Sequence, residues 1–167
     1  MSQKHLSAPT DEAWRQTHLG RWMGHALRKF DERVRSLMAQ DDETPLALSN
    51  LAVRDKVGAA HIHITRHLSL QGDRMTELAE RAGMSKQAML DVVDQCEAWG
   101  LVVRVADPHD RRAKRVQYTD AGKEWHWAFQ RAVQQAEAEF VEAVGEDIAM
   151  VTRLGLEAYG SEVGDVA

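Results

Sequence analysis

Between residues 75 and 119 the spacing of apolar residues changes twice, and each change marks the boundary of a predicted element. The first part has the period of a short amphipathic helix. We expect it to end at Gly83, because glycine adopts the left-handed backbone that closes a helix. Ser85 is then placed to cap a second helix, and two helices joined by so short a turn cross steeply, as in a helix-turn-helix. The first apolar stripe consists of Leu78, Ala79 and Ala82.

The second helix is predicted over residues 86–99 and has two different faces. One face is apolar and is expected to be buried; it holds Met89, Val92, Val93 and Cys96. The other face offers hydrogen-bonding groups to a partner outside the fold, mostly in the first turns: Ser85, Lys86, Gln87, Leu90, Asp91 and Asp94.

After Gly100 the residues that share a face recur at every second position, which predicts strands over residues 101–105 and 114–118. The turn between them opens at Asp107-Pro108. A helix-turn-helix followed by a hairpin with a cationic tip is a winged helix. The cations around this tip are Arg111, Arg112, Lys114 and Arg115.

Long amphipathic helices flank this module. On the N-terminal side we expect a helix from Glu12 to Ala39, capped by Asp11, then a loop over residues 40–45, and a helix from Ser49 to about His67. The first of these helices is long for a small domain, so we expect it to pack against a second subunit. Its apolar side holds Leu19, Trp22, Met23, Ala26, Phe30, Val34 and Leu37.

On the C-terminal side Thr119 is placed to cap a helix over residues 120–144, which Gly145 separates from a final helix over residues 146–159. The predicted fold is therefore mainly α with a small β-wing. The apolar face of the longer helix holds Trp125, Phe129, Ala132, Val133, Ala136 and Phe140, and that of the last helix holds Ile148, Val151, Leu154 and Ala158.

Three segments in this order resemble the multiple-antibiotic-resistance regulators, the MarR family. They are ELAERAGMSKQA over the turn, VVDQCEAWGLV over the second helix, and DPHDRRAKRVQYTDAG over the wing. The last segment carries the family's D-x-R core as Asp110 and Arg112. Leu90 and Asp91 depart from the family, whose members commonly have a small polar residue and a basic residue there.

The resemblance implies one domain over residues 1–167, with a winged helix-turn-helix lobe at 49–119 between dimerisation helices at 11–45 and 120–160. It further implies a homodimeric repressor that a small, anionic aromatic effector releases from a pseudo-palindromic operator. Asp110 is expected to hold the arginine of the D-x-R pair and so to shape the wing tip. The residues expected to contact double-stranded DNA are Ser85, Lys86, Gln87, Leu90, Asp91, Arg111, Arg112, Lys114 and Arg115.

Composition agrees with a single globular domain, since 44% of the 167 residues are hydrophobic and 28% are charged. The sequence shows no run of about 18 apolar residues and no secretory leader. A single cysteine allows no internal disulfide, so a cytoplasmic location is expected. The net charge of -5 is unusual for a DNA-binding protein. Acidic residues gather toward the C-terminus, however, and the positive field is confined to the wing.

Catalytic chemistry is not indicated, because the chain has neither a glycine-rich phosphate loop nor a G-x-S-x-G elbow. We therefore expect no enzyme and no cofactor. Cys96 lies on the apolar stripe, so a packing role is favoured over redox sensing.

Histidine is the unusual feature, with eight in the chain and three in the helix that precedes the winged module. His63 and His67 are one helical turn apart, the spacing that a metal would need, but two histidines alone fall short of a complete ligand set. The hypothesis for the effector is a pocket for an aromatic acid, lined by Trp22, His25 and either His61 or His63.

Two other functions stay open. One is a metal-responsive regulator of the same fold. The other is a winged-helix module that binds a protein and has weak affinity for DNA, which the departure at Leu90 and Asp91 favours.

Overall fold

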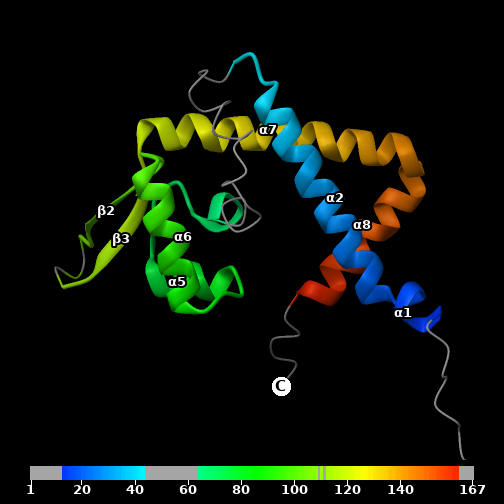
Figure 1. Cartoon of the computed structure of the whole chain (residues 1–167), viewed down its shortest axis with the longest axis horizontal. Coiled ribbons are helices and arrows are strands. Elements are labelled where there is room, and N and C mark those ends of the chain that lie inside the picture. Colours follow the sequence, from blue (N-terminus) through cyan, green and yellow to red (C-terminus); the bar gives the residue numbers. More distant parts are fainter. Residues whose placement is uncertain (1–12, 44–63, 109, 111, 162–167) are drawn as a thin grey trace, which may run out of the picture.

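The computed structural model describes residues 13–43, 64–108, 110 and 112–161. The fold is mainly α with a small antiparallel sheet, as the sequence predicts (Figure 1). Residues 64–67, at the end of the helix predicted from Ser49, are also helical. The elements are α1 (Ala13–Thr17), α2 (Leu19–Ala39), β1 (Asp73–Arg74), α5 (Met75–Arg81), α6 (Lys86–Ala98), β2 (Val102–Ala106), β3 (Lys114–Tyr118), α7 (Asp120–Val144) and α8 (Glu146–Gly160).

The long helix α7 connects the two parts of the molecule (Figure 1). The winged-helix lobe, built from α5, α6 and the sheet, lies beneath the first half of α7, while α2 packs across its middle. At Gly145 the backbone takes a φ of 88°, and α8 folds back from the end of α7. The part of α2 nearest its N-terminus therefore extends away from the lobe, together with α1 and α8.

The first helix is broken, although the sequence predicts one continuous helix from Glu12 to Ala39. His18 has an extended backbone, and its Nδ1 accepts a hydrogen bond from the amide of Arg21 at 3.1 Å. A side chain that satisfies an amide of the next turn begins a new helix. The sequence pattern does not reveal the break at His18, because apolar residues continue at helical spacing on both sides of it. The predicted caps Asp11 and Ser49 lie outside the described residues.

The predicted caps at Ser85 and Thr119 and the predicted turn at Gly83 agree with the structure. Ser85 Oγ accepts a hydrogen bond from the amide of Ala88 at 3.2 Å, and Thr119 Oγ1 accepts one from the amide of Gly122 at 3.0 Å. Gly83 closes the turn after α5 with a φ of 61°. The helix predicted to end at residue 99 ends one residue earlier, at Ala98.

The sheet has three strands in the order β1-β3-β2, whereas the sequence predicts a two-stranded ribbon. The additional strand β1 pairs with β3 through Asp73 opposite Val116 and Arg74 opposite Arg115. A strand of two residues is too short to show a period of two. Gly72 precedes it with a φ of 78°, and a β-carbon built there would lie 2.7 Å from the carbonyl oxygen of Val116. The sequence patterns therefore missed this strand.

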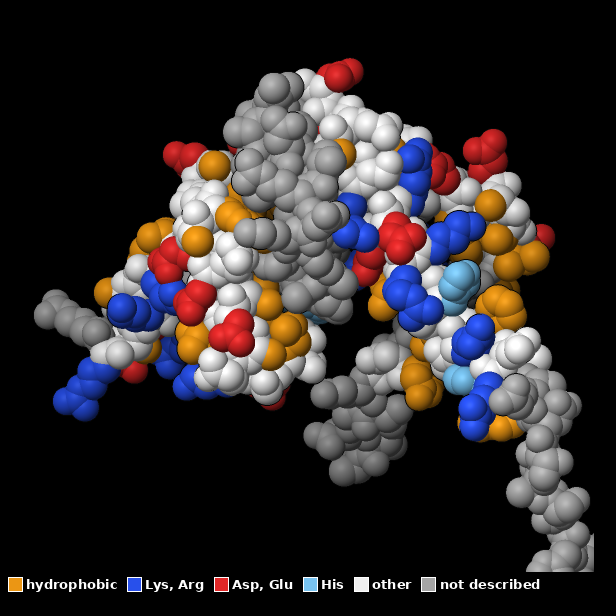
Figure 2. Space-filling view, in the orientation of Figure 1, with side chains coloured by type: hydrophobic (Ala, Val, Ile, Leu, Met, Phe, Trp, Pro, Cys, Tyr) orange, Lys and Arg blue, Asp and Glu red, His pale blue; other side chains and the backbone are white. Residues whose placement is uncertain are grey.

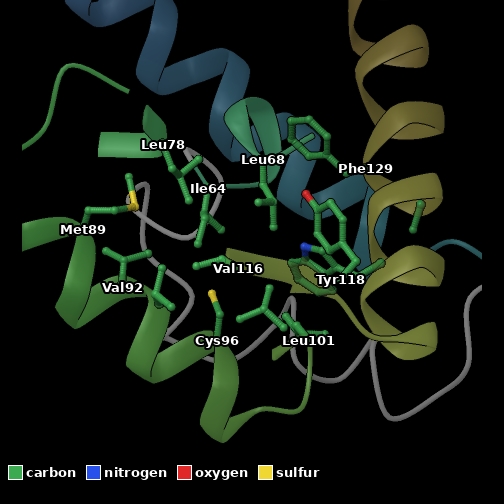
Figure 3. Packing of buried hydrophobic residues seen from close by; sticks show 14 of the residues in the cluster. Ile64, Leu68, Leu78, Met89, Val92, Cys96, Leu101, Val116, Tyr118 and Phe129 are labelled. Atoms are coloured by element: carbon green, nitrogen blue, oxygen red, sulfur yellow. The ribbon is translucent and has the colours of Figure 1, made fainter. Parts of the chain in front are cut away.

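The core joins the winged-helix lobe to α7 (Figure 3). Each large aliphatic side chain buried in this way stabilises the fold by about 1.5 to 3 kcal/mol. Within it, Trp125 Nε1 donates to the hydroxyl of Thr65 at 3.1 Å, so the largest buried ring also has a polar partner. Residues labelled in the figure include Ile64, Leu68, Leu78, Met89, Val92, Cys96, Leu101, Val116, Tyr118 and Phe129.

Cys96 belongs to this core and is 2% exposed. Burial raises the pKa of its thiol to about 12. The reactive form of cysteine is the thiolate, which is scarce at neutral pH when the pKa is so high. The predicted packing role of Cys96 is therefore in agreement with the structure.

Candidate nucleic-acid interface

The start of α6 presents a polar face to solvent, as the sequence predicts. Ser85, Lys86, Gln87 and Asp91 are exposed, and Leu90 is 36% exposed between them. The opposite face is fixed in the core through Met89, Val92, Val93 and Cys96. An α-helix held in this way, with its first turns projecting, has the size and shape that the major groove of DNA admits.

The acidic residues of α6 have different partners. Arg104, on β2, forms ion pairs with both Asp94 and Glu97, and its amide also donates to Glu97 Oε1 at 3.2 Å. Asp91 instead accepts a hydrogen bond from Gln87 Nε2 at 3.1 Å. In the space-filling view, acidic side chains over α6 lie beside basic side chains of the wing (Figure 2). Asp94 and Glu97 thus share one cationic partner within the lobe, Arg104, whereas Asp91 has a neutral partner.

The wing carries basic side chains with two different environments. Arg112 and Lys114 are exposed, so both can reach a partner outside the fold. Arg115 is partly buried, and its guanidinium donates to the carbonyl oxygen of Gly72, next to β1. Arg111 lies outside the described residues. The structure therefore brings Arg112 and Lys114 to the surface of the wing and directs Arg115 inward.

Asp110 shapes the wing tip through the backbone. Its Oδ1 accepts a hydrogen bond from the amide of Arg112 at 3.1 Å, which holds the turn between the strands. The ion pair that Asp110 forms in the structure is with Arg74 at 3.9 Å. The side chain of Arg112 is thus left exposed, although the resemblance implied that Asp110 would hold it.

Arg74 connects the wing to the helix-turn-helix, a role that sequence patterns did not indicate. Its Nε donates to Asp107 Oδ2 at 2.7 Å, and the side chain of Asp107 is 2% exposed at the base of the wing. This hydrogen bond raises the pKa of Arg74 above its ordinary value, which keeps the guanidinium charged. A pair between residues 33 positions apart has no signature in local spacing.

A second ion pair braces the turn into α5. Arg81 Nη2 donates to Asp73 Oδ1 at 3.0 Å, and the amide of Ser69 donates to Asp73 Oδ2 at 2.6 Å. Burial alone would raise the pKa of Asp73, but these hydrogen bonds outweigh it and the pKa is lowered. Asp73 therefore stays ionised and joins the C-terminal end of α5 to the turn that precedes β1.

A cleft of about 500 Å³ opens between α2, α7 and the helical turn at residues 64–67. This volume is in the range of small-molecule sites. Trp22 and His25, predicted to line an effector pocket, lie exposed on α2 and contact each other edge to face, whereas His61 and His63 lie outside the described residues. The residues that line the cleft are Phe30, Thr65, Arg66, His126, Phe129, Gln130, Val133 and Glu137.

The cleft combines aromatic walls with a few polar groups. Arg66 forms an ion pair with Asp31, whose side chain is 8% exposed. His126 packs against Tyr118 with ring centroids 5.4 Å apart, and its buried Nδ1 has no hydrogen-bond partner among the described residues. Burial lowers the pKa of His126, so the ring is neutral at pH 7. A buried polar atom without a partner is costly unless a water or ligand satisfies it.

The helices outside the winged-helix lobe expose apolar surface. None of the residues of α8 is buried in the single chain, although the helix is rich in aliphatic side chains. Monomers rarely expose contiguous apolar patches of this kind. The exposed residues on α1, α2 and α8 include Trp14, Leu19, Trp22, Leu27, Ile148, Met150, Val151, Leu154, Leu156 and Tyr159.

In the described part of the chain, no group of three or more histidine, cysteine, aspartate or glutamate side chains is placed to hold a metal ion. None of the described helices is both long and apolar enough to cross a membrane.

Comparison with known proteins agrees with this geometry. A sequence model of the MarR family matches residues 59–113, which include α5, α6, β2 and most of the wing turn. The resemblance seen in the sequence is therefore confirmed over the helix-turn-helix and the first strand of the wing.

Solved structures extend the similarity to the flanking helices. The PcaV transcriptional regulator from Streptomyces coelicolor, in complex with its natural ligand, has a TM-score of 0.62 at 19% identity and covers 93% of this chain and 99% of its own. The transcriptional repressor CouR, bound to a 23-mer DNA duplex, has a TM-score of 0.60 at 19% identity over 90% and 99% of the two chains. CouR from Rhodococcus jostii RHA1, bound to p-coumaroyl-CoA, has a TM-score of 0.59 at 21% identity over 87% and 96%. At these identities the likeness establishes the fold.

Proposed function

We propose that this chain, a winged-helix protein of the MarR type, acts as a homodimeric transcriptional regulator that binds a pseudo-palindromic operator. The observation that carries the proposal is the exposed polar face at the start of α6 beside the exposed Arg112 and Lys114 of the wing. In this arrangement α6 enters the major groove, where base edges are distinguishable. The wing cations contact the phosphates or the adjacent minor groove, whose negative potential attracts arginine.

Dimerisation is part of the proposal because the apolar surface on α1, α2 and α8 needs a partner. A second copy of the same chain is the economical occupant, since a two-fold axis lets one patch cover its own equivalent. We assign residues 11–45 and 120–160 to this interface and residues 49–119 to the DNA-binding lobe. Sedimentation of the wild type is expected to give a dimer, and Leu154→Glu on α8 is expected to give a folded monomer. An unchanged sedimentation coefficient for the variant would place the interface elsewhere.

A gel shift with the DNA upstream of the coding region tests DNA binding. We expect a shift that weakens steeply with salt, and half-sites about 10 base pairs apart, since a two-fold dimer binds successive turns of one groove face. A protein-interaction module with weak DNA binding is the competing function, favoured by the carboxylate of Asp91 on α6. No shift at low salt, and no enrichment of genomic fragments, would support that alternative.

The cleft between α2 and α7 is our proposed effector site, and an aromatic carboxylate is the proposed class of ligand. Phe30 and Phe129 offer aromatic surface. Arg66 keeps further N–H groups beyond the one that Asp31 uses, and the Nδ1 of His126 has no partner within the described structure. A ligand here can change DNA affinity only by favouring one spacing of the two lobes over another.

Titration with benzoates, hydroxybenzoates and nicotinates, followed by operator release, tests the effector site. The matched variant is Val133→Trp, which places a large side chain in the cleft. We expect it to abolish the response to the ligand while leaving operator affinity within a few-fold of the wild type. A response that persists unchanged in the variant would move the effector site to another part of the chain.

A further inference from the structure

The hydrogen bond between Gln87 and Asp91 sets this recognition helix apart from an ordinary basic one. Both side chains are exposed on the same face of α6, one helical turn apart, with Nε2 and Oδ1 at 3.1 Å. The other two carboxylates of α6, Asp94 and Glu97, are held by Arg104. Among the described residues, Asp91 is therefore the carboxylate of α6 whose partner is a neutral side chain and not a cation.

An unbalanced carboxylate on a DNA-contacting face is costly beside phosphates. It contributes favourably only where it accepts a hydrogen bond from a base, and the major groove has two kinds of donor: the N4 amino group of cytosine and the N6 amino group of adenine. Cytosine N4 has a neighbouring acceptor on one side only, the O6 of the paired guanine. Adenine N6 lies between two acceptors, its own N7 and the O4 of thymine.

The position of Gln87 indicates which of these two donors the carboxylate of Asp91 contacts. One N–H of its amide is used for Asp91, which leaves the second N–H as a donor directly beside the carboxylate. The hydrogen-bonded unit thus presents one donor next to an acceptor. This pattern complements the major-groove edge of a G·C pair, where the acceptor O6 of guanine lies next to the donor N4 of cytosine. At an A·T pair, adenine N6 lies between two acceptors, and only one of them can meet the N–H of Gln87. The other acceptor would face the carboxylate of Asp91 with no donor between them.

We propose that Gln87 and Asp91 act together as a single recognition unit for one G·C base pair in each half-site. The proposal rests on the DNA-binding function proposed above and specifies a position of its operator. Asp91 accepts from cytosine N4, Gln87 donates to guanine O6, and the hydrogen bond between the two side chains fixes their relative orientation before DNA is bound. The carboxylate also repels the phosphates of unrelated sequences, so that the same residue raises selectivity in two ways.

Binding to an operator library with every position varied tests the proposal. The informative variant is Asp91→Asn, which has nearly the same shape and lies on the surface, so the fold is preserved. We expect its preference for G·C at one position per half-site to fall about tenfold relative to the wild type. Gln87→Leu is expected to weaken the preference at that same position, because both residues contact one base pair.

The matched control is Asp94→Asn, which removes the same charge from the same helix at a residue that pairs with Arg104. Its preference at the G·C position is expected to stay as in the wild type. If Asp91→Asn tightens binding to every sequence equally and no position loses selectivity, the recognition unit is refuted while the proposed function stands. If the wild type enriches no sequence at all, the proposed function itself fails. Loss of preference at two different positions for the two variants would refute the joint contact.

Discussion

Gly122, in the first turn of α7, lies against the carbonyl group of Leu101, and a β-carbon at this glycine would be 1.8 Å from the carbonyl oxygen. The contact lets the helix begin directly on the turn before the wing, where Thr119 donates its hydroxyl to the carbonyl of Gly100 at 2.6 Å. Since the obstacle is backbone, we expect Gly122→Ala to destabilise the fold by about 2 to 3 kcal/mol, as overpacking does. Thermal unfolding measures this loss.

Gly24 in α2 provides the control for that substitution. A β-carbon there would meet only the flexible end of Arg28 at 3.5 Å. Gly24→Ala is therefore expected to be neutral or to stabilise by up to about 1 kcal/mol, the usual gain from replacing glycine in a helix. Equal unfolding temperatures for the two variants would contradict the close approach of Gly122 to Leu101.

Replacing Arg74 tests the attachment of the wing. Arg74→Ala removes the hydrogen bond to the carboxylate of Asp107, whose side chain is 2% exposed, and we expect a lower free energy of unfolding. The double variant Arg74→Ala/Asp107→Asn should recover part of this loss, because the buried charge is removed as well. Urea unfolding of the four proteins gives the coupling energy between the two residues. Strict additivity would show that they act independently.

The wing arginines are expected to differ in their effect on salt dependence. Arg112→Ala should reduce the slope of log affinity against log salt by about 1, since one phosphate contact is lost. Arg115→Ala should leave the slope nearly unchanged and lower the unfolding temperature, because the guanidinium is bonded to the carbonyl of Gly72. Operator binding at several salt concentrations separates the two. A reduced slope for Arg115→Ala would mean that its side chain turns outward on DNA.

The lowered pKa of Asp73 leads us to expect that the stability of the fold decreases at acidic pH. The folded-state pKa of this residue is lowered, so its pair with Arg81 contributes stability above the ordinary aspartate pKa of about 3.9, and the contribution is lost as the pH falls through the folded-state value. We expect Asp73→Asn to be less stable than the wild type at pH 7, with a difference that closes below about pH 4. Urea unfolding across this range is the measurement, and a constant difference would contradict the assignment.

The sequence was sufficient where a signal is local. Ser85 and Thr119 were predicted as caps because a hydroxyl before an apolar run satisfies an amide three residues on, and both do so. Met89, Val92, Val93 and Cys96 were predicted to be buried because helical period places them on one face, and all four are in the core. Leu154 and its neighbours on α8 were recognised as an apolar face by the same rule.

What the sequence could not supply depends on contacts between distant segments. Arg74 and Asp107 are ordinary surface residue types until the chain folds and brings them within 2.7 Å of each other. The direction of Arg115 depends in the same way on β1, which is too short to be recognised. The cleft between α2 and α7 was missed because His126 and Gln130 have no pattern of their own; they become a site only when Phe30 closes the other side.

The burial of Cys96, which is the only cysteine of the chain, makes this protein suited to distance measurements by spectroscopy. Its thiol is inaccessible and protonated at neutral pH, so maleimide or methanethiosulfonate reagents will react selectively with a second, exposed cysteine. Lys114→Cys would place one spin label on the wing of each subunit of a dimer. The separation of the two labels, recorded with and without operator DNA or an aromatic acid, would then report the spacing of the lobes directly.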